Sequence, residues 1–273
     1  MNHFQAELAA KHQLYVRQRL GGGLSQARVW LLAQGAVGRR AAALLASLPL
    51  GGLTIQGLLP GDVAGIQQAA FAAAPGRRVV GQPWQAKHMG LQAARTDLLV
   101  LATERPFPQV LERINQDCQR LDLPWTQVQL WGVEIVLGPS VVPGLTACHE
   151  CYTRRRRANE ARLDVWDARE RYFRAEPSHG LAGQISPLLN QAAAYLSIEV
   201  GRLLGAGPTP ASLGCELLWN AFTSAHSASP VVPVEHCTVC GQRQSRGPDH
   251  ADSLDAVVAR LLERQQEASY VER

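Results

Sequence analysis

Long apolar runs are missing from this sequence. No stretch of about 18 consecutive uncharged apolar residues occurs, the length that a membrane-spanning helix needs. Residues 1–20 carry polar side chains throughout, whereas a secretory signal requires an apolar stretch there. With 273 residues, of which 46% are hydrophobic, the chain can still bury a sizeable core. We therefore expect a soluble globular protein in the cytoplasm, with no membrane partner.

Lysine is scarce as well and occurs only at Lys11 and Lys87. The net charge of +4 is mildly basic, and much of the positive excess lies in one run, residues 154–157. Proteins that bind nucleic acids usually present a broad basic face, so we expect no nucleic-acid partner. A short run of this kind more often pairs with nearby acidic side chains, here those of residues 159–170, or with an acidic peptide.

Cysteine is present in a pattern that indicates metal binding. Four of the six cysteines form two C-x-x-C pairs, Cys148 with Cys151 and Cys237 with Cys240. Structural disulfides do not persist in a reducing cytoplasm, whereas two such pairs supply the four thiolates of a closed tetrahedral zinc site. Because the pairs are far apart in sequence, we expect a structural zinc that staples two distant segments. A redox pair of the thioredoxin kind, which needs a single C-x-x-C, is the less favoured alternative.

Hydrophobic patterns predict alternating helices and strands. We expect helices over residues 5–20, 39–47, 106–123, 154–176, 185–207 and 250–273, and strands over 28–33, 52–59, 77–84, 96–103 and 208–222, with one or two more over 124–144. A strand, a glycine turn at residues 34–38 and a helix in series are typical of a doubly wound α/β sheet. We expect a single domain over 1–273, with an N-terminal helical segment (1–27), a zinc-stapled part (148–240) and a C-terminal helix (250–273).

The order of these features resembles the ThiF-like, ubiquitin-activating-enzyme-like fold, whose members adenylate a carboxylate. Residues 15–18, YVRQ, are similar to the N-terminal Tyr-x-Arg-Gln segment of that family, and residues 33–38, AQGAVG, to its glycine-rich turn. Residues 97–106 and 114–125 resemble a strand and a helix with an Asn, a Cys and a Pro at the family's spacing. The resemblance implies a mostly parallel Rossmann-type sheet with flanking helices and a tetrathiolate zinc staple.

Residues 124–155 resemble a narrower group, the zinc-binding ThiF-like partner proteins of YcaO cyclodehydratases. Gly138-Pro139, Pro143-Gly144 and Thr146 carry this match. Such proteins accompany enzymes that make thiazolines and oxazolines in ribosomally made peptides, and several bind the leader of the precursor. The resemblance implies a YcaO-type enzyme and a precursor peptide as partners, and it allows a homodimer.

The residues that the family uses to hold ATP are missing at several positions. An adenylating member ends its second strand with an acid for the ribose and carries a basic segment for the phosphates. Here Asp62 comes late and after a proline, and the basic segment before residue 96 is lacking. Glu104 stands where a magnesium-binding Asp is expected and could replace it. Because adenylyl transfer depends on positioned positive charge, we expect Gly35 and Gly38 to form a vestigial nucleotide turn, with ATP binding doubtful.

These observations favour a non-catalytic subunit with no catalytic residues of its own. It would bind the precursor peptide or the YcaO enzyme while that enzyme converts Cys, Ser or Thr to azolines. Arg154 and Arg155, beside the first cysteine pair, are the candidate partner-binding residues. The alternative is an active, ATP-dependent adenylating enzyme that acts on a peptide or protein carboxylate.

Overall fold

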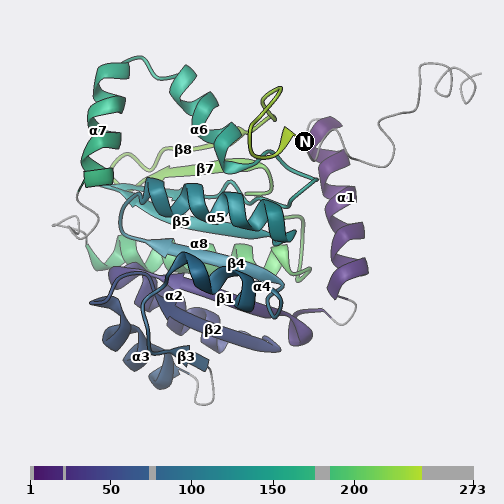
Figure 1. The fold of residues 1–273 in the computed structure, drawn as a ribbon, viewed down its shortest axis with the longest axis vertical. Helices are drawn as coiled ribbons and strands as arrows, with labels where there is room; N and C mark the ends of the chain where they lie inside the picture. The colour runs from purple at the N-terminus through teal and green to yellow at the C-terminus, as the bar shows by residue number, and fades with distance from the viewer. Residues whose placement is uncertain (1–2, 21–22, 74–77, 176–184, 242–273) are drawn as a thin grey trace, which may run out of the picture.

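The computed structural model describes residues 3–20, 23–73, 78–175 and 185–241 (Figure 1). Its strands are β1 (Arg28–Ala33), β2 (Gly52–Gly57), β3 (Arg78–Val80), β4 (Leu98–Thr103), β5 (Trp125–Trp131), β6 (Glu134–Leu137), β7 (Cys215–Asn220) and β8 (His226–Pro230). Its α-helices are α1 (His3–Leu20), α2 (Gly35–Ser47), α3 (Asp62–Ala73), α4 (Met89–Ala93), α5 (Pro108–Leu121), α6 (His149–Ala158), α7 (Leu163–Ala175) and α8 (Ser186–Leu203). Short 3-10 helices cover Leu24–Gln26 and Ala86–His88.

These strands form one sheet in the order β3-β2-β1-β4-β5-β6-β7-β8. The pairs among β1 to β5 are parallel, whereas β6, β7 and β8 add an antiparallel extension. Strand β1 pairs with β2 on one side, with Arg28 opposite Gly52, and with β4 on the other, with Val29 opposite Leu98. The strand order therefore reverses between β1 and β4. In open α/β sheets, ligands bind beyond the carboxyl ends of the strands at such a point.

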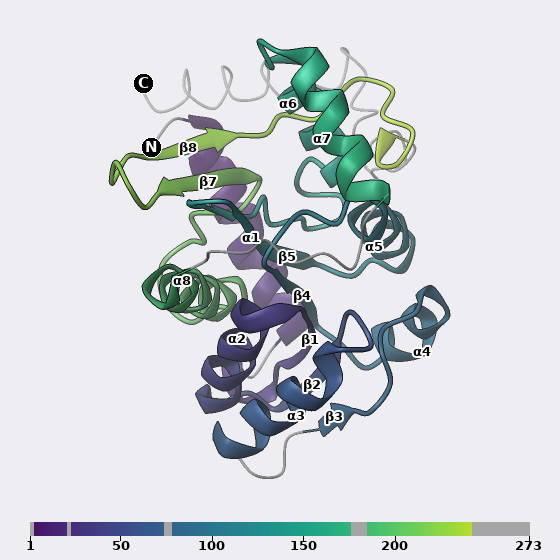
Figure 2. The same cartoon turned by 90° about the vertical axis from the view of Figure 1, so that its left-hand side faces the viewer.

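Helices cover both faces of the sheet. Figure 2 shows α2 and α8 on one face and α4 and α5 on the other. Coverage on both sides explains why β4 reads as a continuous apolar run, since all of its residues are buried. Helix α1 lies at the side of the molecule in Figure 1, where Leu8 joins the core. Helices α6 and α7 extend beyond α5 toward the top of the same view.

Alternate side chains of β1 enter two different cores. Val29 and Leu31 pack on the face that α2 and α8 cover. Trp30 and Leu32 point to the opposite face, where Ile114 of α5 packs in the same cluster. Because successive strand residues point to opposite faces, a shift of one residue would exchange the two cores, so burial fixes the position of the glycine turn that follows β1.

Most of the predicted elements are confirmed, and one is wrong. Residues 154–176 do not form one continuous helix, because α6 ends at Ala158 and α7 begins at Leu163. Asn159 is the C-cap of α6, and its backbone has left the helical conformation, with a φ of −93° and a ψ of 0°. Asn and Asp side chains compete for backbone hydrogen bonds and favour helix ends over helix interiors. The helix predicted over residues 250–273 lies outside the described residues, and the single-domain boundaries stay a prediction.

Two features of the fold have no counterpart in the sequence prediction. The crossover from β3 to β4 contains a 3-10 helix and α4. Strand β8 follows β7 through a short turn and forms the last described strand of the sheet. None of the helices within the described ranges is both long enough and apolar enough to cross a membrane.

Candidate functional site

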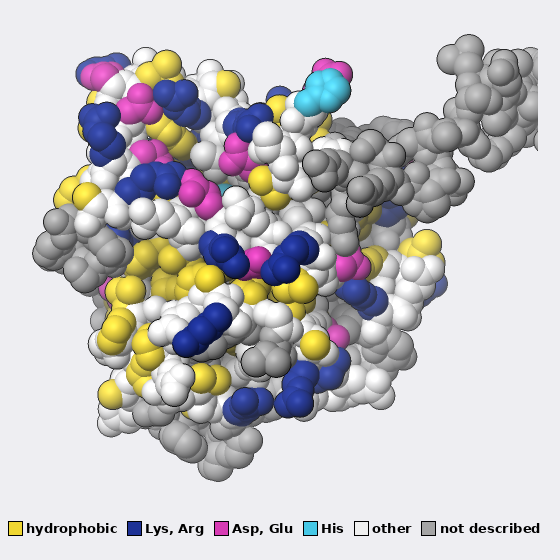
Figure 3. Space-filling model, in the orientation of Figure 1, with side chains coloured by type: hydrophobic (Ala, Val, Ile, Leu, Met, Phe, Trp, Pro, Cys, Tyr) yellow, Lys and Arg dark blue, Asp and Glu magenta, His cyan; other side chains and the backbone are white. Residues whose placement is uncertain are grey.

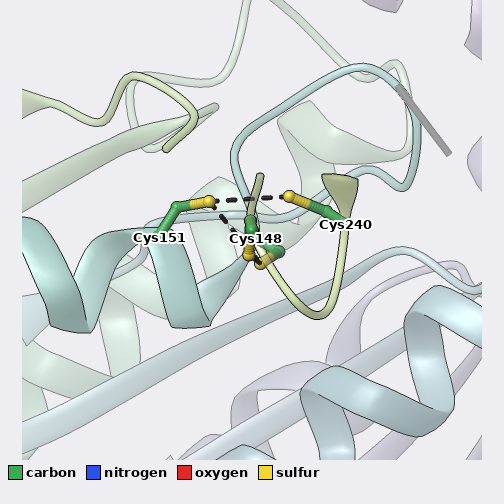
Figure 4. A group of neighbouring side chains, drawn as sticks. Cys148, Cys151 and Cys240 are labelled. Carbon is green, nitrogen blue, oxygen red and sulfur yellow. Dashed lines mark hydrogen bonds between the residues drawn. The ribbon is translucent and has the colours of Figure 1, made fainter. Parts of the chain in front are cut away.

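The four cysteines of the two C-x-x-C pairs meet in space, although 85 residues, 152–236, separate the pairs. Their sulfur atoms lie within 4.8 Å of one another, and all four residues are buried. The Sγ atoms of Cys148 and Cys151 are 3.8 Å apart, those of Cys148 and Cys237 are 3.7 Å apart, and those of Cys151 and Cys240 are 3.5 Å apart. Figure 4 shows Cys151, in the first turn of α6, pointing toward Cys240, with the sulfur of Cys148 close by.

These separations fit a tetrahedral metal site. A disulfide would bring two sulfurs to about 2.05 Å, and all four cysteines are free. Four thiolates at about 2.3 Å from a zinc ion, placed tetrahedrally, lie about 3.8 Å from one another. The cluster therefore has the donor set and the spacing of a closed structural site, which leaves no open coordination position for chemistry.

The local structure also suits thiolates. Cys148 is the N-cap of α6 and Cys151 lies in its first turn, where the positive end of the helix dipole favours negative charge. The backbone N–H of Val234 donates to the Sγ of Cys151 at 3.3 Å. Hydrogen bonds from Cys148 and Cys240 lower the pKa of the Cys151 thiol. A cation at the centre would extend this preference for the thiolate form to the whole cluster.

The arginine run beside the first pair is hydrogen-bonded to this chain. Arg154 donates to Glu150 at 2.6 Å, and Arg155 donates to the carbonyl oxygens of Val232 and Pro233. Arg157 pairs with Asp167, as expected for an acid in residues 159–170. Figure 3 shows positive and negative side chains interleaved over α6 and α7, at the upper left. That Arg154 and Arg155 bind a partner stays a prediction, and the bonds of Arg155 to Val232 and Pro233 also hold α6 to that segment.

Arg156 takes part in a buried polar cluster that the sequence does not predict. Its guanidinium lies 4.0 Å from the centre of the Trp131 ring and pairs with Glu216 of β7. Tyr152 donates to the same carboxylate, and burial raises the pKa of this phenol. Beside it, burial lowers the pKa of His149 to about 4. These contacts join α6, and with it the first cysteine pair, to the sheet.

The glycine turn after β1 lies at the carboxyl ends of β1 and β4, as the resemblance implies. Gly35 has a φ of 67°, a conformation that favours glycine. A Cβ on Gly38 would lie 2.9 Å from the backbone carbon of Ala33, so this glycine lets α2 approach β1 closely. The side chain of Gln34 accepts a hydrogen bond from the backbone N–H of Glu104 at 2.9 Å and ties the two strand ends together.

Two carboxylates of the chain accept hydrogen bonds from the backbone N–H groups at the start of α2. Asp62 accepts a hydrogen bond from the N–H of Gly35 at 2.9 Å, and Glu104 accepts one from the N–H of Ala36. A Cβ on Gly35 would lie only 2.2 Å from the carboxyl carbon of Glu104. Burial raises the pKa of Asp62, against the opposing effect of its bonds from the N–H groups of Gly35 and Leu59.

These amides form the positive end of the helix, where a phosphate would be bound in a dinucleotide turn. Asp62 is therefore part of the turn, although in the sequence it stands too far beyond β2 to be recognised. Glu104 faces the turn as well. Both carboxylates therefore place negative charge where the phosphates of a nucleotide would lie.

Comparisons with known proteins bear on the fold. No protein-family model matches the chain, and no curated protein matches its sequence. The crystal structure of E. coli MccB with ATP has a TM-score of 0.61 and 20% identity over 84% of this chain and 70% of that chain. The microcin C7 biosynthetic enzyme MccB in complex with N-formylated MccA has a TM-score of 0.62 and 20% identity over the same shares. Selenomethionine PaaA has a TM-score of 0.57 and 15% identity over 85% of this chain and 84% of that chain.

The fold is ThiF-like. At these identities the likeness extends to the fold and no further, and it confirms the prediction of an α/β sheet with flanking helices. Within this ThiF-like fold, the chain combines a tight cluster of four cysteines with a glycine turn whose amides already hold two carboxylates.

Proposed function

We propose that this chain is a non-catalytic ThiF-like subunit of a peptide-modifying system. It binds a ribosomally made precursor peptide, a YcaO-type cyclodehydratase, or both. The partner enzyme carries out the ATP-dependent conversion of Cys, Ser or Thr residues to azolines. The chain works in the cytoplasm, where a reducing environment keeps the thiols of its cysteine cluster available for a structural zinc.

The observation that supports the non-catalytic part is the occupation of the turn by Asp62 and Glu104. Transfer of a phosphoryl or adenylyl group relies on positive charge placed around the phosphates. Here carboxylates accept the hydrogen bonds of Gly35 and Ala36, the amides that a phosphate would otherwise use. A nucleotide would have to displace them or bring its negative charge beside theirs, at a cost in binding free energy.

The peptide-binding part of the proposal draws on the fold and on the sequence resemblance. A structure of similar fold, the microcin C7 biosynthetic enzyme MccB, holds the N-formylated peptide MccA. Residues 124–155 provide the resemblance to YcaO partner proteins, and these residues lead into the first cysteine pair. We propose that the zinc-stapled part positions α6 and β7 for contact with the peptide or the partner enzyme.

Two observations favour the alternative, an active adenylating enzyme. E. coli MccB, whose fold is similar, has been crystallised with ATP. Gly35 also keeps the positive φ of a functional turn. If Glu104 moved to coordinate magnesium, the turn amides would become available to a phosphate.

Pyrophosphate exchange separates the two functions. The purified chain is incubated with ATP, magnesium, labelled pyrophosphate and candidate precursor peptides, with MccB and MccA as the positive control. We expect no label in ATP above the protein-free blank. Incorporation that depends on this chain would overturn the non-catalytic proposal.

Co-expression tests the partners. A tagged copy of the chain is purified together with a candidate YcaO enzyme, and the complex is sized by light scattering. A stable complex that modifies the precursor only when both proteins are present is the expected outcome. Sizing of the chain alone also tests whether it forms a homodimer.

A further inference from the structure

Strand β8 presents an edge on which another strand could pair. Among the described strands it pairs only with β7. The N–H of Asn220 donates to the carbonyl of Ala225 at 2.9 Å, and the N–H of Val231 donates to the carbonyl of Gly214 at 2.8 Å. Because hydrogen-bonded pairs alternate along an antiparallel ladder, the intervening residues that bond to β7 are Ser227 and Ser229.

The alternation leaves His226 and Ala228 with their backbone N–H and C=O groups directed away from β7. Pro230, which has no N–H, ends the strand and limits how far pairing can continue. The outer edge of β8 is therefore short, but it carries two residues in the geometry that β-augmentation uses.

An apolar groove of about 490 Å³ lies beside this edge. Its apolar lining comes from α8, β6 and β7, namely Tyr195, Ile198, Ile135, Leu217 and Trp219. Figure 2 shows α8 over the central strands, with β7 and β8 extending past it. Ile198 is 54% exposed on α8, although its side chain is fully apolar. A ligand that covers Ile198 would remove this apolar surface from water, which is favourable.

On the β8 side, the groove is lined by a small residue, Ala228. Ala228 stands opposite Leu217 in the β7–β8 register, and both line the groove. A strand added outside β8 would lie about 4.8 Å further on. A long side chain from such a strand could pass over Ala228 and reach Leu217, since neighbouring strands bring such side chains within contact range.

Hydrogen-bond donors at the rim of the groove can hold a carboxylate. Glu199 is buried, and its carboxylate already accepts hydrogen bonds from Ser212 and from Arg202 at 3.3 Å. The groove also contains the imidazole of His226. Arg202 has further guanidinium N–H groups besides the one that bonds to Glu199. A carboxylate on the occupant would therefore meet hydrogen-bond donors at this rim.

We propose that an extended peptide with alternating apolar residues and at least one carboxylate binds here, as an additional strand on β8. Its backbone pairs with His226 and Ala228, and its apolar side chains enter the groove against Ile198 and Leu217. The groove volume of about 490 Å³ lies in the range of sites that hold a small ligand. This proposal rests on the peptide-binding role proposed above and names the surface that performs it.

Peptide selection on the purified full-length chain tests the proposal. Random peptides of about ten residues, longer than a typical strand, are displayed and selected without nucleotide. The peptides recovered are then labelled with fluorescein, and fluorescence anisotropy gives their affinity for the wild type and for four variants. Ala228→Pro removes the outward N–H of β8, whereas Ala228→Ser keeps it. Ile198→Glu charges the groove, and Val165→Glu is its control, because Val165 is 51% exposed on α7.

We expect the selected peptides to alternate apolar residues and to include an acid. Ala228→Pro and Ile198→Glu should each weaken binding roughly tenfold or more, while Ala228→Ser and Val165→Glu stay within about twofold of the wild type. Thermal melting checks that each variant folds. If Ala228→Pro fails to fold, the comparison of Ile198→Glu with Val165→Glu decides the matter.

Three results would overturn the proposal. The first is that no peptide is enriched over the display background. The second is that the selected peptides bind the wild type and all four variants equally. Alternatively, sedimentation shows a wild-type dimer that Ile198→Glu dissociates, in which case a second copy of the chain covers the groove. Because the selection contains no ATP, its outcome is separate from that of pyrophosphate exchange, and a peptide that binds elsewhere would leave the non-catalytic role intact.

Discussion

The Nη2 of Arg155 donates a hydrogen bond to the backbone carbonyl of Pro233 at 2.9 Å. This bond links the helix that carries the first cysteine pair to the segment that enters the second. We expect Arg155→Ala to lower the free energy of unfolding by about 1 kcal/mol, since it removes a charged donor from two carbonyls. Urea titration measures the change, with Arg162→Ala as the control, because within the described residues the guanidinium of Arg162 pairs with its sequence neighbour Asp164 alone. Unchanged stability with loss of partner binding would make Arg155 a docking residue instead.

We expect one zinc ion per chain, held by Cys148, Cys151, Cys237 and Cys240. Cys237→Ser should abolish tight zinc binding and lower the melting temperature, because a site with three thiolates no longer closes around the ion. Elemental analysis of reduced protein, purified without chelators, measures the zinc. The control is Cys215→Ser, at a buried cysteine outside the cluster. Absence of metal from the wild type would contradict the prediction.

ATP should bind the wild type with a dissociation constant weaker than about 1 mM, with or without magnesium. The reason is the negative charge that Asp62 and Glu104 place at the turn amides. Glu104→Gln removes one of these charges and should strengthen the binding of inorganic pyrophosphate. Calorimetry measures both ligands, and Glu112→Gln, on α5, is the control. Micromolar binding of ATP to the wild type would show that the turn is a working nucleotide site.

Stability should fall as the pH drops below about 6.5, in part because of His12. This residue is buried, and burial lowers the pKa of its imidazole from 6.5. Below pH 6.5 the imidazole is protonated in the unfolded chain but stays neutral in the folded chain. The contribution of the neutral His12 to the free energy of unfolding is therefore complete above pH 6.5 and is lost as the pH decreases. The slope from one group is at most about 1.4 kcal/mol per pH unit.

His12→Gln should flatten this part of the profile. Urea unfolding at several pH values between about 5 and 8 gives the comparison, and His226→Gln, at an exposed position, is the control. A wild-type slope that survives His12→Gln would assign the effect to another group. Both variants leave unchanged the charged residues that line the same cavity as His12. These residues are Arg19, Arg28, Asp97 and Asp122.

The sequence predicts those parts of the structure that depend on local pattern. Strand β1 matches the predicted range 28–33, because its apolar residues are continuous and a glycine turn follows them. The cysteine cluster was also predictable, because two C-x-x-C pairs in one chain have few other uses. Both predictions needed only the residues of the motif itself.

The parts that the sequence does not predict depend on distant contacts. Asp62 follows β2 and accepts a hydrogen bond from the N–H of Gly35, which precedes β2. No local sequence pattern indicates that these two residues are in contact. Strand β8 has no large apolar residue and every one of its residues is exposed. It therefore lacks the alternation by which strands are recognised, and its pairing with β7 defines it. The break between α6 and α7 was missed because the arginines and acids on either side of Asn159 are all compatible with a helix.

A metal ion held by the four cysteines would close residues 148–240 into a ring of chain that contains α6, α7, α8, β7 and β8. An ion that binds the assembled site and not the unfolded chain stabilises the fold by its own binding free energy. The two cysteine pairs meet when β7 is paired with β6 and α6 is packed on the sheet. We therefore expect metal binding to come late in folding. The rate of metal binding would then measure how fast the antiparallel strands form. A chelator should unfold the antiparallel half of the sheet before the parallel half.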